Sequence, residues 1–273
     1  DFLYSVGVDI SRFICKFAWR KQNLSANNIM VGFPKITVIT VCMNAADALE
    51  RTLKNISQQD YSNMEVIVVD GASTDSTPDV MREMSGLISR SVSEKDKGIY
   101  DAMNKGVGMA TGDYCIFMNA GDEFADTDTL SRVFGRDRCA DVIYGDVVKK
   151  GSDDNRYVKH AENPHNAHRM FFCHQSSFVR RECLREFPFD IRYTMSADFK
   201  LFKLLWKCGK KFCKLDFPIA LFDTGGVSNT HRGDGISQNI MIIKELDGFL
   251  DRLRLLPRLY FVLFILRLKS CMK

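Results

Sequence analysis

Short apolar runs alternate with amphipathic segments over the first half of the chain. Residues 36–41 are β-branched throughout, and residues 65–69 and 114–118 are short, mainly apolar runs, which favours buried strands. Between them, residues 46–58 and 99–109 place apolar side chains three or four positions apart, which predicts helices. Strands that alternate with helices over short links indicate right-handed crossovers. The pattern therefore predicts an α/β protein with a mostly parallel central sheet flanked by helices.

The remaining pattern is less regular. We expect further helices at 77–84, where Pro78 suits a first turn, and at 127–134, 198–208 and 236–250. Further strands are expected at 87–92, 142–148 and 219–222. Residues 170–179 are interpreted as a strand that leads into a site, and residues 225–228 as a flexible turn.

Polar side chains follow the predicted strands where each strand ends. Asn44, Asp70, Asp96 and Asp122 fall after successive strands, with Asp75 close behind Asp70. Because parallel strands end at one edge of a sheet, these side chains are expected to gather at that edge, where open α/β sheets bind ligands. Carboxylates gathered in this way repel one another unless cations or hydrogen-bond donors satisfy them.

Composition is that of an ordinary globular protein, with 45% apolar and 26% charged residues in a chain of 273. The net charge of +4 does not suggest a nucleic-acid partner. The nine cysteines follow no regular framework, so reduced thiols and a cytoplasmic location are expected. Gly106, Gly108 and Gly112 precede a strand instead of following one, which argues against a dinucleotide-binding fingerprint.

The two ends differ from the middle. We divide the chain into an N-terminal helical extension (1–33), a main α/β domain (34–235) and a helical basic and apolar tail (236–273). Residues 252–273 carry six basic side chains and no acidic one. Such a tail can lie on an anionic membrane surface or pack on the core, and both alternatives stay open.

Several blocks resemble a known family. The segments ITVITVCMN, EVIVVDGASTDST, EKDKGIYDAMNKG and CIFMNAGDEF are similar, in order and spacing, to family 2 glycosyltransferases, which have the nucleotide-sugar-binding GT-A fold. Later segments, FCHQSSFVRR, SADFKLF and GGVS, look like the bacterial branch that builds colanic acid, O-antigen and related surface polysaccharides. The resemblance covers about residues 35–230.

The resemblance implies inverting transfer of a sugar from a nucleoside diphosphate sugar to a hydroxyl of a lipid-linked or polysaccharide acceptor. The family's metal motif is reduced here to Asn119-Ala120-Gly121-Asp122, so Asp122 is the expected ligand of Mg²⁺ or Mn²⁺. The residues expected to bind the donor are Thr40, Asn44, Asp70, Asp96 and Asn119.

Asp198 matches the family's general base, although an acid in a first helical turn also stabilises the helix dipole. His174 and Gln175 are expected to contact the acceptor or the diphosphate, and His231 is a weaker candidate. Lys105 and Arg180 are candidate cations for the diphosphate. Because the metal motif is depleted, a catalytically silent nucleotide-sugar-binding or scaffold protein remains the alternative function. The peripheral inner face of the cell membrane is the alternative location.

Overall fold

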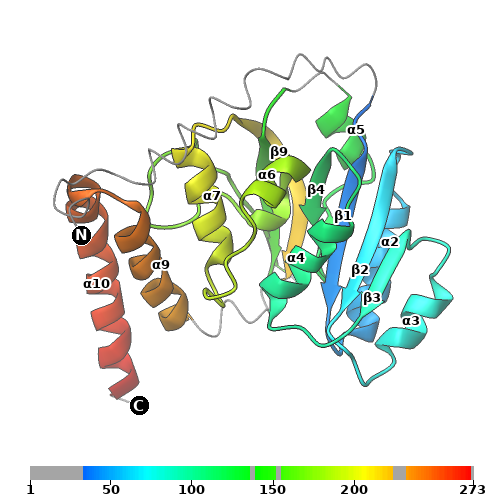
Figure 1. Ribbon diagram of the computed structural model, residues 1–273, viewed down its shortest axis with the longest axis horizontal. Coiled ribbons are helices and arrows are strands. Elements are labelled where there is room, and N and C mark those ends of the chain that lie inside the picture. The colour runs from blue at the N-terminus through cyan, green and yellow to red at the C-terminus, as the bar shows by residue number, and fades with distance from the viewer. Residues whose placement is uncertain (1–32, 136–138, 152–154, 224–231, 272–273) are drawn as a thin grey trace.

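The computed structural model describes residues 33–135, 139–151, 155–223 and 232–271 (Figure 1). The expected N-terminal helical extension, apart from residue 33, and the expected turn at 225–228 lie outside the described residues. The strands are β1 (Ile36–Cys42), β2 (Met64–Asp70), β3 (Arg90–Ser93), β4 (Tyr114–Phe117), β5 (Glu123–Phe124), β6 (Val142–Lys150), β7 (Arg156–Lys159), β8 (Ser177–Arg180) and β9 (Phe212–Asp223).

These strands form one sheet in the order β3-β2-β1-β4-β8-β6-β9-β5, with β7 paired to β6. The pairs among β1, β2, β3 and β4 are all parallel, as the alternating pattern predicts. Beyond β4 the sheet is mixed, because β8 runs antiparallel to both β4 and β6 while β6 and β9 are parallel. The carboxyl ends of β1, β2 and β4 therefore meet at one edge.

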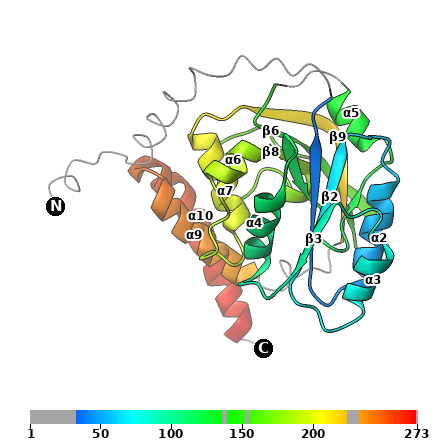
Figure 2. The ribbon, with the colours of Figure 1, turned by 45° about the vertical axis from the view of Figure 1, so that its right-hand side comes forward.

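Helices cover both faces of the sheet. They are α2 (Ala46–Ser57), α3 (Thr77–Glu83), α4 (Ile99–Met109), α5 (Thr129–Phe134), α6 (Arg181–Glu186), α7 (Ala197–Lys207), α9 (Arg232–Leu246), α10 (Phe249–Cys271) and the 3₁₀ turn η2 (His174–Ser176). Figure 2 shows α2, α3 and α5 on one side of the sheet, and α4, α7, α9 and α10 on the other.

Each face of the sheet has its own apolar core, because successive strand side chains point to opposite faces. In β1, Val38 packs with Leu53 of α2, whereas Ile39 and Val41 pack in the cluster that contains Met103 of α4. The second cluster continues through α7 and α9 to Leu255 of α10. This cluster therefore joins the parallel half of the sheet to the C-terminal helices.

The edge of the sheet opposite the strand ends is fixed by a buried carboxylate. Glu65 accepts hydrogen bonds from the Thr37 hydroxyl (2.6 Å) and from the backbone and hydroxyl of Thr111 (both 2.6 Å), and it pairs with Lys35 (2.9 Å). Burial opposes ionisation, but these donors lower the pKa of Glu65 to about 2. Gly112 lies in the same turn, where a Cβ atom would meet Thr37 Oγ1 at 2.6 Å.

Several sequence-based boundaries need correction. The strand expected at 87–92 begins only at Arg90, since residues 84–88 form a hydrogen-bonded turn. Residues 170–179 do not form a strand that leads into a site: the turn η2 comes first and β8 follows it. β9 begins seven residues earlier than expected, at Phe212, and the short elements β7 and α6 were not expected.

The C-terminal segment forms two helices instead of one helix and a tail. α9 ends at Leu246, and α10 runs from Phe249 to Cys271 beside it (Figure 1). Ile242 and Ile243 of α9 and Leu255 and Leu259 of α10 are buried in the main core. Among the described residues, no helix is both long enough and apolar enough to cross a membrane. The three-part division of the chain stays a prediction.

Candidate active site

The end of β2 forms a closed polar loop around Asp70. This carboxylate is fully buried and accepts hydrogen bonds from the backbone of Ser73 (3.1 Å) and the hydroxyl of Ser93 (2.5 Å). The Ser73 hydroxyl also donates to it. Asp70 therefore lies at the expected edge and fixes the loop between β2 and α3, while its role in binding a donor stays a prediction.

Asn44 and Asp96 flank the same loop. Asn44 has a φ of 49°, a left-handed conformation that asparagine tolerates, and its side-chain oxygen accepts a hydrogen bond from Thr74 N at 2.9 Å. The Asp96 carboxylate accepts from Gly98 N at 2.8 Å and lies directly over Gly71, where a Cβ atom would be 2.7 Å from Asp96 Oδ2. The structure thus brings Asn44, Asp70 and Asp96 together at one end of the sheet.

Asp122 closes the loop that follows β4. Its carboxylate accepts a hydrogen bond from Asn119 N (3.1 Å), and the Thr52 hydroxyl of α2 donates to its backbone carbonyl (2.8 Å). Gly121 takes a φ of 101° in this tight loop. The Asn119 side-chain oxygen is buried and has no hydrogen-bond partner within the described part of the chain. A buried amide oxygen without a partner beside a carboxylate suits a hard cation or a ligand hydroxyl.

Asp198 lies in the first turn of α7 and joins three elements. Its Oδ1 accepts a hydrogen bond from the Tyr100 hydroxyl of α4 at 3.0 Å, and its Oδ2 lies 3.4 Å from His174 Nδ1 of η2. Burial would raise the pKa of Asp198, but His174, the Phe199 amide and Tyr100 outweigh it and hold the pKa below its ordinary value. Asp198 is therefore ionised near neutral pH and oriented from both sides.

His174 and Gln175 lie on η2, at the same end of the sheet. His174 Nε2 is buried, and it forms no hydrogen bond with any residue in the described ranges. Gln175 is buried, and its Oε1 accepts from the Cys173 thiol at 2.8 Å. Burial, with the nearby Asp122 carboxylate, raises the pKa of Cys173 to about 11. The turn η2 therefore links the Asp122 loop to Asp198.

Thr40 lies inside the sheet, two residues before the end of β1. Its side chain is fully buried, and Thr40 Oγ1 also has no hydrogen-bond partner among the residues that the structure describes. Three of the predicted site residues, Thr40, Asn119 and His174, thus carry buried polar atoms that have no partner within the described ranges. Such atoms are rare in folded proteins and mark places where a ligand or water is expected.

Tyr100 is the site residue that the sequence did not indicate, because its position in the apolar stripe of α4 is typical of a core residue. Lys105, a candidate cation, is held on α4 by Glu94 (2.9 Å) and by the carbonyl of Lys95 (3.0 Å). The suggestion for Arg180 is wrong: it pairs with Tyr114, the first residue of β4, at the opposite edge of the sheet. His231 lies outside the described residues.

The described residues contain no clustered metal site, and most of their cysteines are free thiols. Within the described residues, no three His, Cys, Asp or Glu side chains are grouped so that they could hold a metal ion. Cys42, Cys115, Cys139, Cys173, Cys183 and Cys213 are free thiols, whereas Cys208 is disulfide-bonded. The expectation of reduced thiols throughout is therefore wrong at Cys208.

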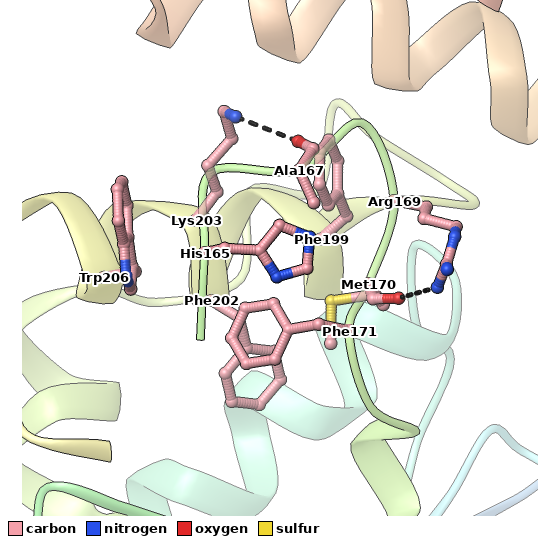
Figure 3. Close-up of a pocket in the computed structure, with 9 residues that line it drawn as sticks. All are labelled: His165, Ala167, Arg169, Met170, Phe171, Phe199, Phe202, Lys203 and Trp206. Atoms are coloured by element: carbon pink, nitrogen blue, oxygen red, sulfur yellow. Dashed lines mark hydrogen bonds between the residues drawn. The ribbon is translucent and has the colours of Figure 1, made fainter. Parts of the chain in front are cut away.

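Two small hollows lie on the surface near α7 and near the start of α4. Figure 3 shows one between α7 and the segment before η2, where Phe171, Phe199, Phe202 and Trp206 form an apolar lining and Lys203 donates to the Ala167 carbonyl at 3.2 Å. It contains none of the predicted site residues. A second hollow, at the start of α4, includes Tyr100, Ile191 and Thr194. Tyr100 lines this second hollow and also donates a hydrogen bond to Asp198, so the hollow lies close to Asp198.

The sheet is parallel from β3 to β4, with polar loops at the carboxyl ends of these strands and an acid in the first turn of α7, an arrangement that agrees with a GT-A fold. The chain belongs to glycosyl transferase family 2, whose family model matches residues 37–199. A Mycobacterium bovis BCG protein described as a PGL/p-HBAD biosynthesis glycosyltransferase is 33% identical over 172 residues, covering 60% of this chain and 67% of that protein. The amylovoran biosynthesis glycosyltransferase AmsB of Erwinia amylovora is 27% identical and covers 79% of each chain.

Solved structures share the fold. Staphylococcus aureus TarS (residues 1–349) in complex with UDP-GlcNAc superposes with a TM-score of 0.61 at 17% identity, covering 81% of this chain and 69% of that one. The mannosyltransferase PcManGT from Pyrobaculum calidifontis, in complex with GDP-Man and Mn²⁺, gives a TM-score of 0.57 at 19% identity, covering 86% and 75%. This chain spans 41% of the longer TarS crystal structure. At these identities the likeness shows the GT-A fold alone.

Proposed function

We propose that this protein transfers a sugar, with inversion, from a nucleoside diphosphate sugar to a hydroxyl of a lipid-linked or polysaccharide acceptor in bacterial surface-glycan synthesis. The observation that carries the proposal is the cluster at the start of α7. There, Asp198 is ionised and held by Tyr100 (3.0 Å) and by His174 (3.4 Å) of η2, the turn that lies next to the Asp122 loop. The printed descriptions of the Mycobacterium and Erwinia relatives support the glycan-biosynthesis part.

In the proposed reaction, the acceptor hydroxyl oxygen forms a bond to the anomeric carbon of the donor. The bond from that carbon to the diphosphate breaks on the opposite face, and the nucleoside diphosphate leaves with the electron pair. Asp198 takes the hydroxyl proton, which is general-base catalysis. Because Tyr100 and the Phe199 amide hold one position of the carboxylate, the base is oriented before the acceptor arrives.

The donor is assigned to residues that follow the carboxyl ends of the parallel strands. The nucleoside is assigned to Thr40, Asn44, Asp70 and Asp96, and the diphosphate to the loop of Asn119 and Asp122, near His174 and Gln175. The buried Asn119 oxygen and the Asp122 carboxylate are the groups that would hold Mg²⁺ or Mn²⁺. A bound cation would stabilise the negative charge that develops on the leaving diphosphate.

The first experiment is a thermal-unfolding titration with UDP-, GDP- and dTDP-sugars, each with and without Mg²⁺ or Mn²⁺. A ligand that binds the folded state alone raises the melting temperature by mass action. We expect one base to give a clear shift that requires the cation. Two solved structures that share the fold contain UDP-GlcNAc and GDP-Man with Mn²⁺, so UDP- and GDP-sugars are the first donors to test.

The catalytic assignment is tested with Asp198→Asn, using the donor that the titration identifies. We expect sugar transfer to fall by about 10²- to 10⁴-fold, the usual contribution of a general base, while donor affinity stays unchanged. Asp216→Asn is the control, because Asp216 is exposed and pairs with Lys214 on the surface. Unchanged transfer by Asp198→Asn would show that the base is misassigned.

The alternative function is a nucleotide-sugar-binding protein without turnover. The single acid left in the metal loop, Asp122, favours it. It predicts a donor-dependent thermal shift in the wild-type protein but no transfer to any acceptor, and equal biological activity for wild type and Asp198→Asn. We place either function in the cytoplasm, at the inner face of the cell membrane.

A further inference from the structure

The last helix has two apolar faces. One face of α10 carries Leu255 and Leu259, which are buried in the main core. Because side chains advance by about 100° per residue, a second stripe falls on the opposite side. We call this stripe the outer face of α10; its members are Leu253, Pro257, Tyr260, Phe261, Phe264 and Leu268.

The outer face is exposed to solvent. The exposed fractions are 58% for Leu253, 66% for Phe261 and 58% for Phe264. Single exposed apolar residues are ordinary, but a run of large ones at helical spacing marks an interaction surface. A helix that needed only to close the core would carry polar residues on this side. The outer face of α10 is therefore a candidate interaction surface.

The charge around the stripe identifies the kind of partner. Residues 249–273 carry six basic side chains and one acidic one, Asp251, which pairs with Arg254 at 3.4 Å. Arg254 and Arg258 lie exposed beside the apolar stripe. Arginines that flank exposed aromatic and aliphatic residues on one helix are typical of segments that lie in the headgroup region of an anionic bilayer. We propose that the outer face of α10 binds an anionic membrane surface, with the helix in the plane of the interface.

Two other occupants are less favourable on charge. A second copy of the chain would place two segments of six basic residues each against one another. Residues 1–32 carry four basic and two acidic side chains, so they too are positive. An anionic lipid surface is opposite in charge to this segment. A second copy of the segment and residues 1–32 both carry net positive charge, as the segment itself does.

The position of α10 relative to Asp198 fits this partner. α10 packs beside α9 and, after the short link at 247–248, runs back toward the start of that helix (Figures 1 and 2). The first turns of α9 contact the residues before Asp198, where Ser196 Oγ donates to the Gly235 carbonyl at 3.2 Å. Docking through α10 would hold the Asp198 end of the molecule near the bilayer. The docking itself does not depend on the proposed transfer reaction.

The test is sedimentation of the full chain with vesicles of phosphatidylcholine, with or without phosphatidylglycerol, at low and high salt. We expect binding to the anionic vesicles that weakens as salt screens the charges. The double variant Phe261→Ser, Phe264→Ser should bind at least about tenfold more weakly, because it removes two large apolar side chains. Leu87→Ser, an exposed leucine between α3 and β3, is the matched control.

A second pair of variants separates charge from apolar contact. Arg258→Gln should weaken binding to anionic vesicles by about fivefold, since each basic residue near such a surface contributes about 1 kcal/mol. Arg51→Gln, on the exposed side of α2, is its control and should bind like the wild-type protein. Both α10 variants should keep the wild-type melting temperature, because the replaced side chains are exposed.

Three results would overturn the proposal. The first is no binding of the wild-type chain to anionic vesicles. The second is binding that the Phe261 and Phe264 changes leave intact. The third is a wild-type dimer in sedimentation equilibrium that the same double variant dissociates, which would assign the outer face of α10 to a second copy.

Discussion

At the scale of single residues, Tyr100 is a buried side chain that lowers the pKa of Asp198, the proposed general base. Its hydroxyl donates to Asp198 Oδ1 at 3.0 Å and is among the groups that lower the pKa of that carboxylate. We expect Tyr100→Phe to remove this donor and so raise the pKa of Asp198. A base works only when unprotonated, so the acidic limb of the rate profile should move to higher pH.

The measurement is the pH dependence of transfer for wild type and Tyr100→Phe with the donor found by thermal titration. Tyr193→Phe is a matched control, because Tyr193 also donates to a carboxylate, that of Glu245 (2.6 Å), away from Asp198. The control should leave the acidic limb in place. A Tyr100→Phe profile identical to that of the wild type would mean that Asp198 does not titrate in the reaction.

At the scale of elements, the loop between β3 and α4 depends on a close approach at Gly71. A Cβ atom there would lie 2.7 Å from Asp96 Oδ2, so Gly71→Ala must push the Asp96 loop away from the end of β2. We expect donor binding to weaken by roughly tenfold, since such overpacking costs about 1–3 kcal/mol, shared between folding and binding. Calorimetric titration with the identified donor measures the change.

Gly86→Ala supplies the comparison for that titration. A Cβ atom on Gly86 would meet no other atom within 4 Å, so this variant changes the same residue type without crowding. It should bind the donor like the wild-type protein. If both alanine variants bound equally well, Asp96 and Gly71 would not belong to the donor site.

The elements that carry strong local patterns were predictable. β1, α2, β2, α4 and β4 agree with the sequence-based expectation within two residues at each end, because their apolar periodicity is set by the two faces of the sheet. The expected edge also holds, since parallel pairing of β1 with β2 and β4 brings their ends together. Asn44, Asp70 and Asp122 lie at or shortly after the ends of β1, β2 and β4, and Asp96 lies between β3 and α4, so their neighbourhood could be inferred.

The second half was harder because its contacts are distant in sequence. β7 and α6 have four and six residues, too few for a periodic pattern to stand out. The pair of Tyr100 and Asp198 is separated by 98 positions, and no local pattern in either segment indicates it. The place of Arg180 could not be predicted, because its strand, β8, runs antiparallel to β4 and so ends at the opposite edge of the sheet.

At the scale of the whole molecule, a buried ionic cluster ties the C-terminal helices to the rest. Asp247, in the link between α9 and α10, is fully buried at its side chain and pairs with Lys203 (2.7 Å) and Lys207 (2.9 Å) of α7. Asn166 also donates to it at 3.1 Å. Burial lowers the pKa of Lys203 even though Asp247 opposes this effect, so the ammonium depends on its partner.

Asp247→Ala should therefore lower the free energy of unfolding by about 3–5 kcal/mol, because it leaves the Lys203 charge buried without its partner. Urea unfolding measures this loss. In the double variant Lys203→Met, Asp247→Leu, apolar side chains replace both charges, and most of the stability should return.

Hydrogen exchange adds a regional test: amides of α10 should exchange faster in Asp247→Ala, while those of β1 keep their protection relative to global unfolding. A loss below about 1 kcal/mol would instead mean that the apolar contacts of Leu255 and Leu259 hold the helices without help from the ionic cluster.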